Sequence, residues 1–135
     1  MSKKKILVVD NDPYILLVTK SRLEANGYEV FTTLDGTETV KIAKKVKPDL
    51  ILLDIIMPAM EGCDVCSKLK QEMETKEIPV LMFTVSSRKD IEELCAKAGA
   101  KAAIAKPFDP AELLALIKKA MDPNSKWRRP RRGNG

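Results

Sequence analysis

The sequence contains no histidine and only three cysteines among its 135 residues, and this scarcity limits the metal chemistry open to it. Cys63 and Cys66 have the C-x-x-C spacing of a zinc or redox motif. With Cys95 as the one further thiol, a four-ligand zinc site would need a carboxylate. We interpret the i, i+3 pair as two small apolar side chains on one helix face. In a chain with no secretory signal, the three cysteines are not expected to form a disulfide framework.

The sequence also lacks a long apolar run. Near the N-terminus, MSKKKILVVD contains an apolar stretch from Ile6 to Val9, which is too short for a signal peptide or a membrane span. We therefore expect a cytoplasmic protein without a membrane span. There is no internal repeat or domain linker either, so the length predicts one domain with a sizeable core.

Net charge is absent from most of the chain. Residues 1–125 hold 19 basic and 19 acidic side chains, so the net charge of +5 comes from the last ten residues. The basic residues there are Lys126, Arg128, Arg129, Arg131 and Arg132. Together with Trp127 they allow at most weak, salt-sensitive nucleic-acid binding, and no DNA-reading motif accompanies them. We expect residues 1–122 to form the domain and residues 123–135 to form a basic, disordered tail.

Short apolar runs alternate with longer amphipathic stretches. The runs predict strands at Ile6–Val9, Tyr28–Thr33, Leu50–Leu53, Pro79–Thr84 and Lys101–Ala105. The stretches predict helices at Pro13–Asn26, Glu38–Val46, Cys63–Met73, Asp90–Ala98 and Asp109–Met121. Five strand–helix units predict an α/β fold of three αβα layers, in which a doubly wound parallel sheet lies between helices.

Polar residues follow the predicted strands at the edge where doubly wound sheets bind ligands. They are Asp10, Asn11, Asp12, Asp54, Thr84 and Lys106. A carboxylate that leaves a buried strand is rigidly placed, so Asp54 is a candidate nucleophile. Asp10, with Asn11 or Asp12, offers oxygen ligands to a hard cation such as Mg²⁺. Thr84 and Lys106 offer a donor and a positive charge to a phosphoryl group.

Four segments resemble, in order, the receiver domain of bacterial response regulators. They are ILVVDND (6–12), LLDIIMPAMEG (52–62), FTVSS (83–87) and AKPF (105–108). The resemblance runs from Ile6 to about Met121, and its most specific part is the LDxxMPxMxG element. It implies a flavodoxin-like fold similar to that of chemotaxis regulators, with five helices and five strands in the order 2-1-3-4-5.

The resemblance also implies a mechanism. A sensor histidine kinase or phosphotransfer protein donates a phosphoryl group to Asp54, and the chain acts as a single-domain, phosphorylation-dependent protein-binding switch rather than as an enzyme. The Mg²⁺ ligands fall on Asp10, Asn11, Asp54 and the backbone carbonyl of Ile56. Thr84 falls on the switch hydroxyl and Lys106 on the lysine that pairs with the phosphoryl group. The neighbouring positions are Asp12, which also caps the first helix, Val85, Ser86 beside the path of the attacking water, and Pro107, which follows Lys106 in a usually cis bond.

Three positions depart from the family pattern. Asn11 replaces an acidic Mg²⁺ ligand, Val85 replaces a small residue, and Ala103 stands where an aromatic residue is frequent. They leave open an alternative, a degenerate receiver that binds its partner without phosphorylation. A remoter alternative is a haloacid-dehalogenase-like phosphatase with Asp10 as nucleophile, although this reading gives no reason for LDIIMPAMEG.

Overall fold

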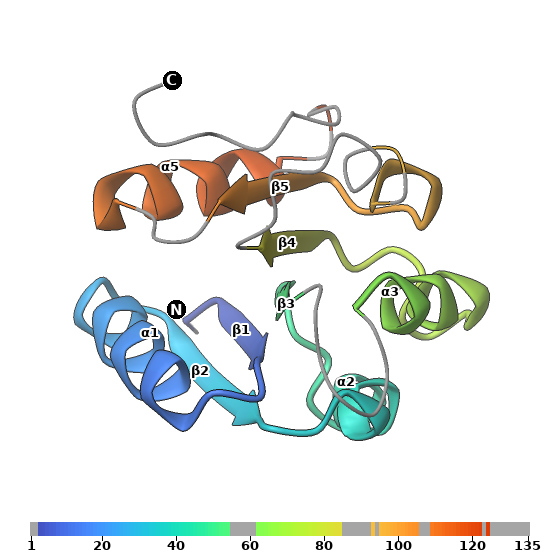
Figure 1. The fold of residues 1–135 in the computed structure, drawn as a ribbon, viewed down its shortest axis with the longest axis horizontal. Coiled ribbons are helices and arrows are strands. Elements are labelled where there is room, and N and C mark those ends of the chain that lie inside the picture. Colours follow the sequence, from blue (N-terminus) through green and yellow to red (C-terminus); the bar gives the residue numbers. More distant parts are fainter. Residues whose placement is uncertain are drawn as a thin grey trace.

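A five-stranded parallel sheet between two layers of helices forms the molecule (Figure 1). The computed structural model describes residues 3–54, 62–84, 93, 95–105, 109–122 and 124. The strands are β1 Lys5–Val9, β2 Glu29–Thr33, β3 Leu50–Asp54, β4 Val80–Thr84 and β5 Ala102–Ala105. Their order in the sheet is β2-β1-β3-β4-β5. The predicted fold class and strand order are confirmed.

The helices are close to the predicted positions. They are α1 Pro13–Ala25, α2 Thr39–Val46, α3 Gly62–Gln71 and α5 Pro110–Ala120, with a short 3₁₀ helix, η1, at Gly36–Glu38. Of the predicted helix Asp90–Ala98, Glu93 and residues 95–97 are helical, and its other described residue is Ala98. Among the described residues, no helix is long and apolar enough to cross a bilayer. Apart from Asn124, the predicted tail lies outside the described residues.

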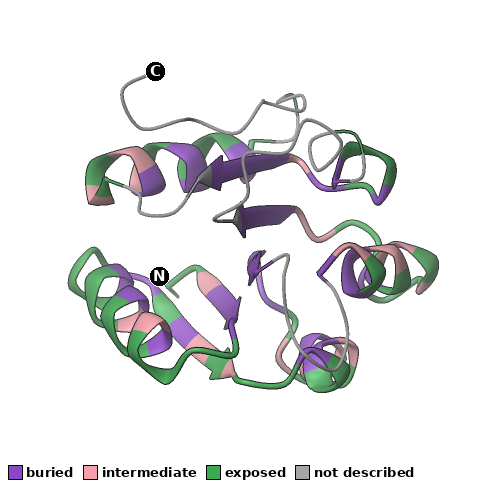
Figure 2. Ribbon diagram, viewed as in Figure 1, coloured by how far each residue is buried: buried purple, intermediate pink, exposed green. Residues whose placement is uncertain are grey.

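Alternate residues of the strands face opposite helical layers. Leu7, Val9, Ile51 and Leu53 belong to a core cluster with residues of α2 and α3. Ile6, Val8, Leu50 and Leu52 belong to a second cluster with residues of α1 and α5. Burial on both faces explains why β1 and β3 are continuous apolar runs, and Figure 2 shows the buried residues concentrated along the sheet. The sheet is therefore a rigid support for the residues at its ends.

The side chain of Lys70, near the end of α3, contacts both the segment before β4 and the turn before β5. The side chain of Lys70 donates from Nζ to the carbonyl oxygens of Ile78 at 2.6 Å and Lys76 at 3.1 Å. Burial lowers the pKa of this ammonium group. Its stem crosses Gly99, where an added Cβ would lie 2.8 Å from Lys70 Cγ. Gly99 also has a φ of +97°, in the region that favours glycine.

Gly99→Ala is expected to destabilise the fold more than Gly27→Ala does. Gly27 has a similar φ of +90° but nothing within 4 Å of an added Cβ, so its variant measures backbone strain alone. The extra cost at Gly99, about 1 kcal/mol, is the overpacking against a lysine stem that is held at its far end. Urea denaturation of both variants gives the two free energies of unfolding. Equal losses would show that Lys70 moves aside freely.

Candidate functional site

Two acidic side chains meet at the carboxyl edge of the sheet. Val9 pairs with Leu53 in the register of β1 and β3, so the next residues, Asp10 and Asp54, lie side by side. Asp10 is fully buried and Asp54 is 6% exposed. The backbone N–H of Asp10 donates to the carbonyl of Thr33 at the end of β2, which holds Asp10 against the neighbouring strand. The register of β1 and β3 therefore places these two acidic residues next to each other at the ends of their strands.

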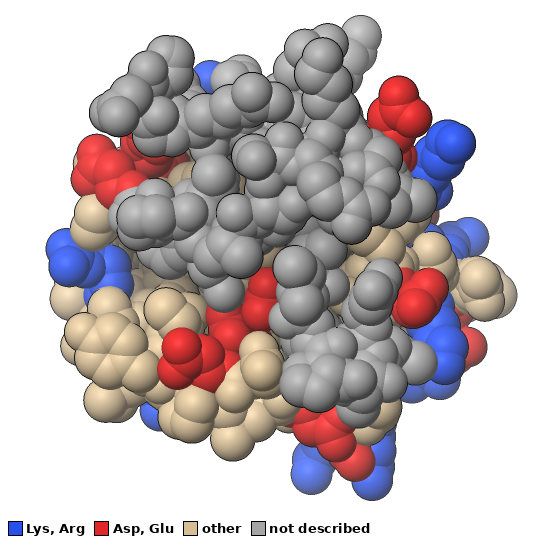
Figure 3. Space-filling view, viewed as in Figure 1, with Lys and Arg blue, Asp and Glu red and all other residues tan. Residues whose placement is uncertain are grey.

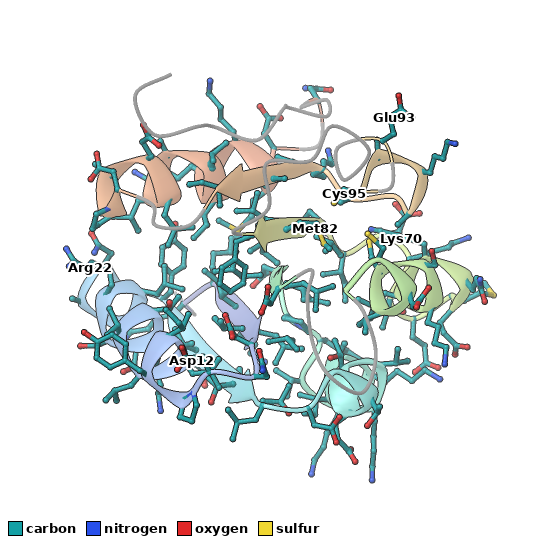
Figure 4. The ribbon with its side chains drawn as sticks, in the orientation of Figure 1. Asp12, Arg22, Lys70, Met82, Glu93 and Cys95 are labelled. Atoms are coloured by element: carbon teal, nitrogen blue, oxygen red, sulfur yellow. The ribbon has the colours of Figure 1, made fainter. Side chains whose placement is uncertain are left out.

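Asp12 orders the turn from β1 into α1 (Figure 4). Its backbone N–H donates to Asp10 Oδ1 at 2.9 Å, and its own Oδ1 accepts from the N–H of Tyr14 at 2.9 Å. The second bond caps α1, with Pro13 in the first helical turn, as the sequence predicts. The first bond orients the Asp10 carboxylate. Asp12 thus orders the turn between β1 and α1. Asn11, between Asp10 and Asp12 in the sequence, is exposed.

The other predicted site residues follow strands that end at the same edge. Asp54 pairs with Phe83, so Thr84 ends β4 one residue further along, and Thr84 pairs with Ala105 of β5. Lys106 comes directly after Ala105 in the sequence. The structure therefore brings Asp10, Asp54 and the backbone of Thr84 together. The predicted residues that lie outside the described part of the chain are Ile56, Val85, Ser86, Lys106 and Pro107.

The charge distribution suits a small cation. Figure 3 shows acidic side chains near the middle of the face on which Figure 4 labels Asp12, whereas the described lysines and arginines lie toward the rim. Two adjacent buried carboxylates repel each other, and a divalent ion between them offsets this repulsion.

The donor set matches Mg²⁺ better than a metal that needs a complete protein cage. Among the described residues there is no group of three or more His, Cys, Asp or Glu side chains that could hold a metal ion. The ends of β1 and β3 offer the carboxylates of Asp10 and Asp54, and Asn11, with its amide, directly follows Asp10 in the sequence. Mg²⁺ uses one or two carboxylates, keeps several waters and accepts phosphate oxygens. The residues present therefore fit this ion.

Ala103 is packed into the core. It is fully buried on β5, pairs with Met82 of β4 and belongs to the same cluster as the α3 residues. At this position the chain has a small side chain in an apolar layer. A ring that could swing between a buried and an exposed position is therefore absent at residue 103.

Comparisons with known proteins agree with this arrangement. The model of the response regulator receiver domain family matches residues 6–118. The alkaline phosphatase synthesis transcriptional regulatory protein PhoP of Bacillus subtilis is 40% identical over 115 residues, which are 85% of this chain and 47% of PhoP. The chain thus spans about half the length of this curated relative.

Two solved structures are similar over nearly their whole length. The chemotaxis protein CheY4 of Vibrio cholerae superposes with a TM-score of 0.84 at 30% identity, covering 88% of this chain and 99% of that one. The receiver domain of the sensor histidine kinase PA1611 of Pseudomonas aeruginosa, described with a magnesium ion coordinated in its active site cleft, gives 0.82 at 27% identity, covering 89% and 98%.

Proposed function

The chain belongs to the response regulator receiver domain family, and on this premise we propose that it accepts a phosphoryl group on Asp54 and works as a phosphorylation-dependent switch. Phosphorylation-based two-component signalling is the activity of this family. The observation that carries the assignment to Asp54 is its position. Asp54 ends a strand that is buried on both faces. It lies directly beside Asp10 on one side, and on the other side it pairs with Phe83, the residue before Thr84 at the end of β4.

The proposed chemistry is a phosphoryl transfer. A carboxylate oxygen of Asp54 attacks the phosphorus atom, and the bond from phosphorus to the nitrogen of a donor phosphohistidine breaks, leaving an acyl phosphate. Bound Mg²⁺, held by Asp10, Asp54, Asn11 and the Ile56 carbonyl, would neutralise negative charge on the phosphoryl oxygens. The hydrogen bond from the Asp12 N–H holds the Asp10 carboxylate in place at the end of β1. In this proposal Thr84 donates a hydrogen bond to the phosphoryl group and Lys106 pairs with it.

Incubation with acetyl phosphate tests this function without knowledge of the cognate kinase. We expect the intact mass to rise by one phosphoryl group when Mg²⁺ is present and to stay unchanged when the metal is chelated. Peptide mapping after borohydride reduction of the acyl phosphate should locate the group on Asp54. A group on Asp10 would support the phosphatase alternative instead, and no uptake at any Mg²⁺ concentration would support the degenerate receiver.

An apolar surface beside the site is the proposed docking area for the phosphodonor protein. Tyr14 and Leu17 of α1 are 69% and 67% exposed, and Leu34 after β2 is 52% exposed. Leu17 and Leu34 line one hollow with Lys20. Large apolar side chains exposed together indicate an interaction site. Since a protein donor must bring its phosphohistidine to the edge where Asp54 lies, we propose that a sensor histidine kinase or phosphotransfer protein covers this surface.

Leu17→Glu is expected to weaken phosphorylation by a protein donor while leaving uptake from acetyl phosphate unchanged. A buried charge at the interface should reduce the transfer rate about fivefold, which is roughly 1 kcal/mol. The measurement compares both donors, using a histidine kinase that phosphorylates the unmodified chain. Met73→Glu is the matched control, because Met73 is 84% exposed but lies beyond α3, after its last residue Gln71. Equal effects of the two variants would place the docking surface elsewhere.

The proposal extends to output and location. We propose a single-domain cytoplasmic receiver whose phosphorylated form binds a downstream protein. The longer relative PhoP, described as a transcriptional regulatory protein, marks the alternative of a receiver joined to an output domain.

A further inference from the structure

The fold brings Cys95 to Cys63 and Cys66, from which it is about 30 residues distant in the sequence. Cys63 and Cys66 lie on α3, and Cys95 lies in the helical segment 95–97. The sulfur atoms of Cys63 and Cys95 are 3.9 Å apart, and Cys66 Sγ donates to the carbonyl of Ala98 at 3.3 Å. Figure 4 shows Cys95 near Lys70 and Met82, on the side of the sheet that α3 covers. The proposed switch uses none of these thiols.

We propose that Cys63 and Cys95 form a reversible disulfide when the protein meets an oxidant of the hydroperoxide class. The two sulfurs belong to different helical segments and already touch. They need to approach by about 1.9 Å to reach bonding distance, a change of the size that side-chain rotation supplies.

The surroundings assign a different part to each thiol. Cys63 is partly exposed and lies in the first turn of α3, where the helix dipole favours negative charge, so an oxidant reaches it first. Cys95 is buried against it and is the partner that closes the bond. The hydrogen bond with Cys63 and burial raise the pKa of Cys95, and burial raises the pKa of Cys66 to about 11, so acidity does not separate these two thiols. Position separates them, because Cys95 Sγ lies 3.9 Å from Cys63 Sγ, whereas Cys66 Sγ donates to the carbonyl of Ala98.

The chemistry balances in two steps. The Cys63 thiolate attacks one oxygen of the hydroperoxide, the O–O bond breaks, and Cys63 becomes a sulfenic acid while the other oxygen leaves as an alcohol or as water. The Cys95 sulfur then attacks the Cys63 sulfur. The S–S bond forms, the S–O bond breaks, and the Cys95 proton leaves with the hydroxide as water. Two thiols lose two electrons in total, and a thiol reductant returns them.

The bond would join the two helical segments that follow β3 and β4 in the chain. The chain runs from Asp54 through residues 55–61 to α3, and from Thr84 through residues 85–92 toward Cys95. A disulfide would fix the distance between these two segments and restrict the unfolded chain, so we expect the melting temperature to rise by roughly 5–10 °C. The inference concerns a redox modification and stands whether or not Asp54 accepts phosphate.

Treatment of the full chain with hydrogen peroxide tests the proposal. We expect the loss of two hydrogen atoms in the intact mass, one thiol left free, a crosslinked peptide pair containing Cys63 and Cys95, and reversal by dithiothreitol. Cys66→Ala should still form the bond. Cys63→Ser, at a partly exposed position that tolerates the change, should not.

Three results would overturn it. They are a bond between Cys63 and Cys66, a bond between two chains, and over-oxidation of Cys63 with Cys95 still a free thiol. If the melting temperature did not change when the Cys63–Cys95 bond forms, the expected stabilisation would be wrong, although the bond itself would be established.

Discussion

Asp54→Asn is expected to abolish phosphoryl uptake and, at the same time, to make the metal-free protein more stable. The amide cannot form an acyl phosphate, so the mass increase with acetyl phosphate should disappear. Because Asp10 and Asp54 lie side by side at the ends of β1 and β3, removing one charge should relieve repulsion on the order of 1 kcal/mol. The melting temperature without Mg²⁺ should therefore rise by a few degrees.

Asp49→Asn is the matched control for Asp54→Asn. Asp49 is also an aspartate beside β3, but it precedes the strand and accepts the N–H of Lys5 at 2.8 Å, at the opposite edge of the sheet. Its variant should keep full phosphoryl uptake and lose stability through the weaker acceptor. If Asp54→Asn still gained a phosphoryl group, the phosphoacceptor would be another residue. If the Asp54→Asn protein were less stable than the unmodified chain, the Asp54 carboxylate would stabilise the fold rather than destabilise it.

Asn11→Asp is expected to tighten Mg²⁺ binding about five- to thirtyfold. An amide oxygen supplies no net charge, and a carboxylate at residue 11 would add one next to a divalent ion. At an effective dielectric of about 20, that attraction amounts to several kcal/mol before desolvation and repulsion between ligands are subtracted, so a net gain of about 1–2 kcal/mol is expected. In the metal-free protein the third carboxylate has no such ion beside it, so the same variant should melt at a lower temperature.

Titrating Mg²⁺ against the melting temperature of both proteins tests the two effects together. The expected curves cross, with the Asn11→Asp protein less stable at zero metal and saturating at lower concentration. Asn26→Asp, at the exposed C-terminal cap of α1, controls for a general effect of added charge. Should neither the starting point nor the midpoint move, residue 11 points away from the metal, and its exposure on the surface would be the reason.

Much of the fold could be predicted because each local signal agrees with the tertiary structure. The continuous apolar run of β3 reflects burial on both faces, and Asp12-Pro13 and Asp109-Pro110 mark the first turns of α1 and α5. The strand order came from the family resemblance, since alternation of strands and helices leaves the order open. Element ends shifted by a residue or two: β3 includes Asp54, and α3 stops at Gln71 rather than Met73.

The site was less predictable where tertiary contacts decide. The sequence placed Asp10 and Asp54 at one edge, but the bond from Asp12 N–H to Asp10 depends on how the turn closes. The interpretation of Cys63 and Cys66 as residues of one helix face is consistent with the half-buried and buried positions on α3. It missed Cys95, because a spacing of 32 residues carries no periodic signal and the contact arises from packing of two helical segments.

The order of the strands also has a consequence for solubility. The strands richest in large apolar side chains, β1, β3 and β4, are interior strands with a hydrogen-bonded neighbour on each side. The two outermost strands of the sheet are β2, whose sequence EVFTT is partly polar, and β5, which has four residues, three of them alanines. Sheet edges are where chains add to one another, and short or polar edges offer little for a second molecule to extend. The folded chain thus keeps its most aggregation-prone segments away from intermolecular strand pairing, and loss of β5 would expose VLMFT of β4 as a new edge.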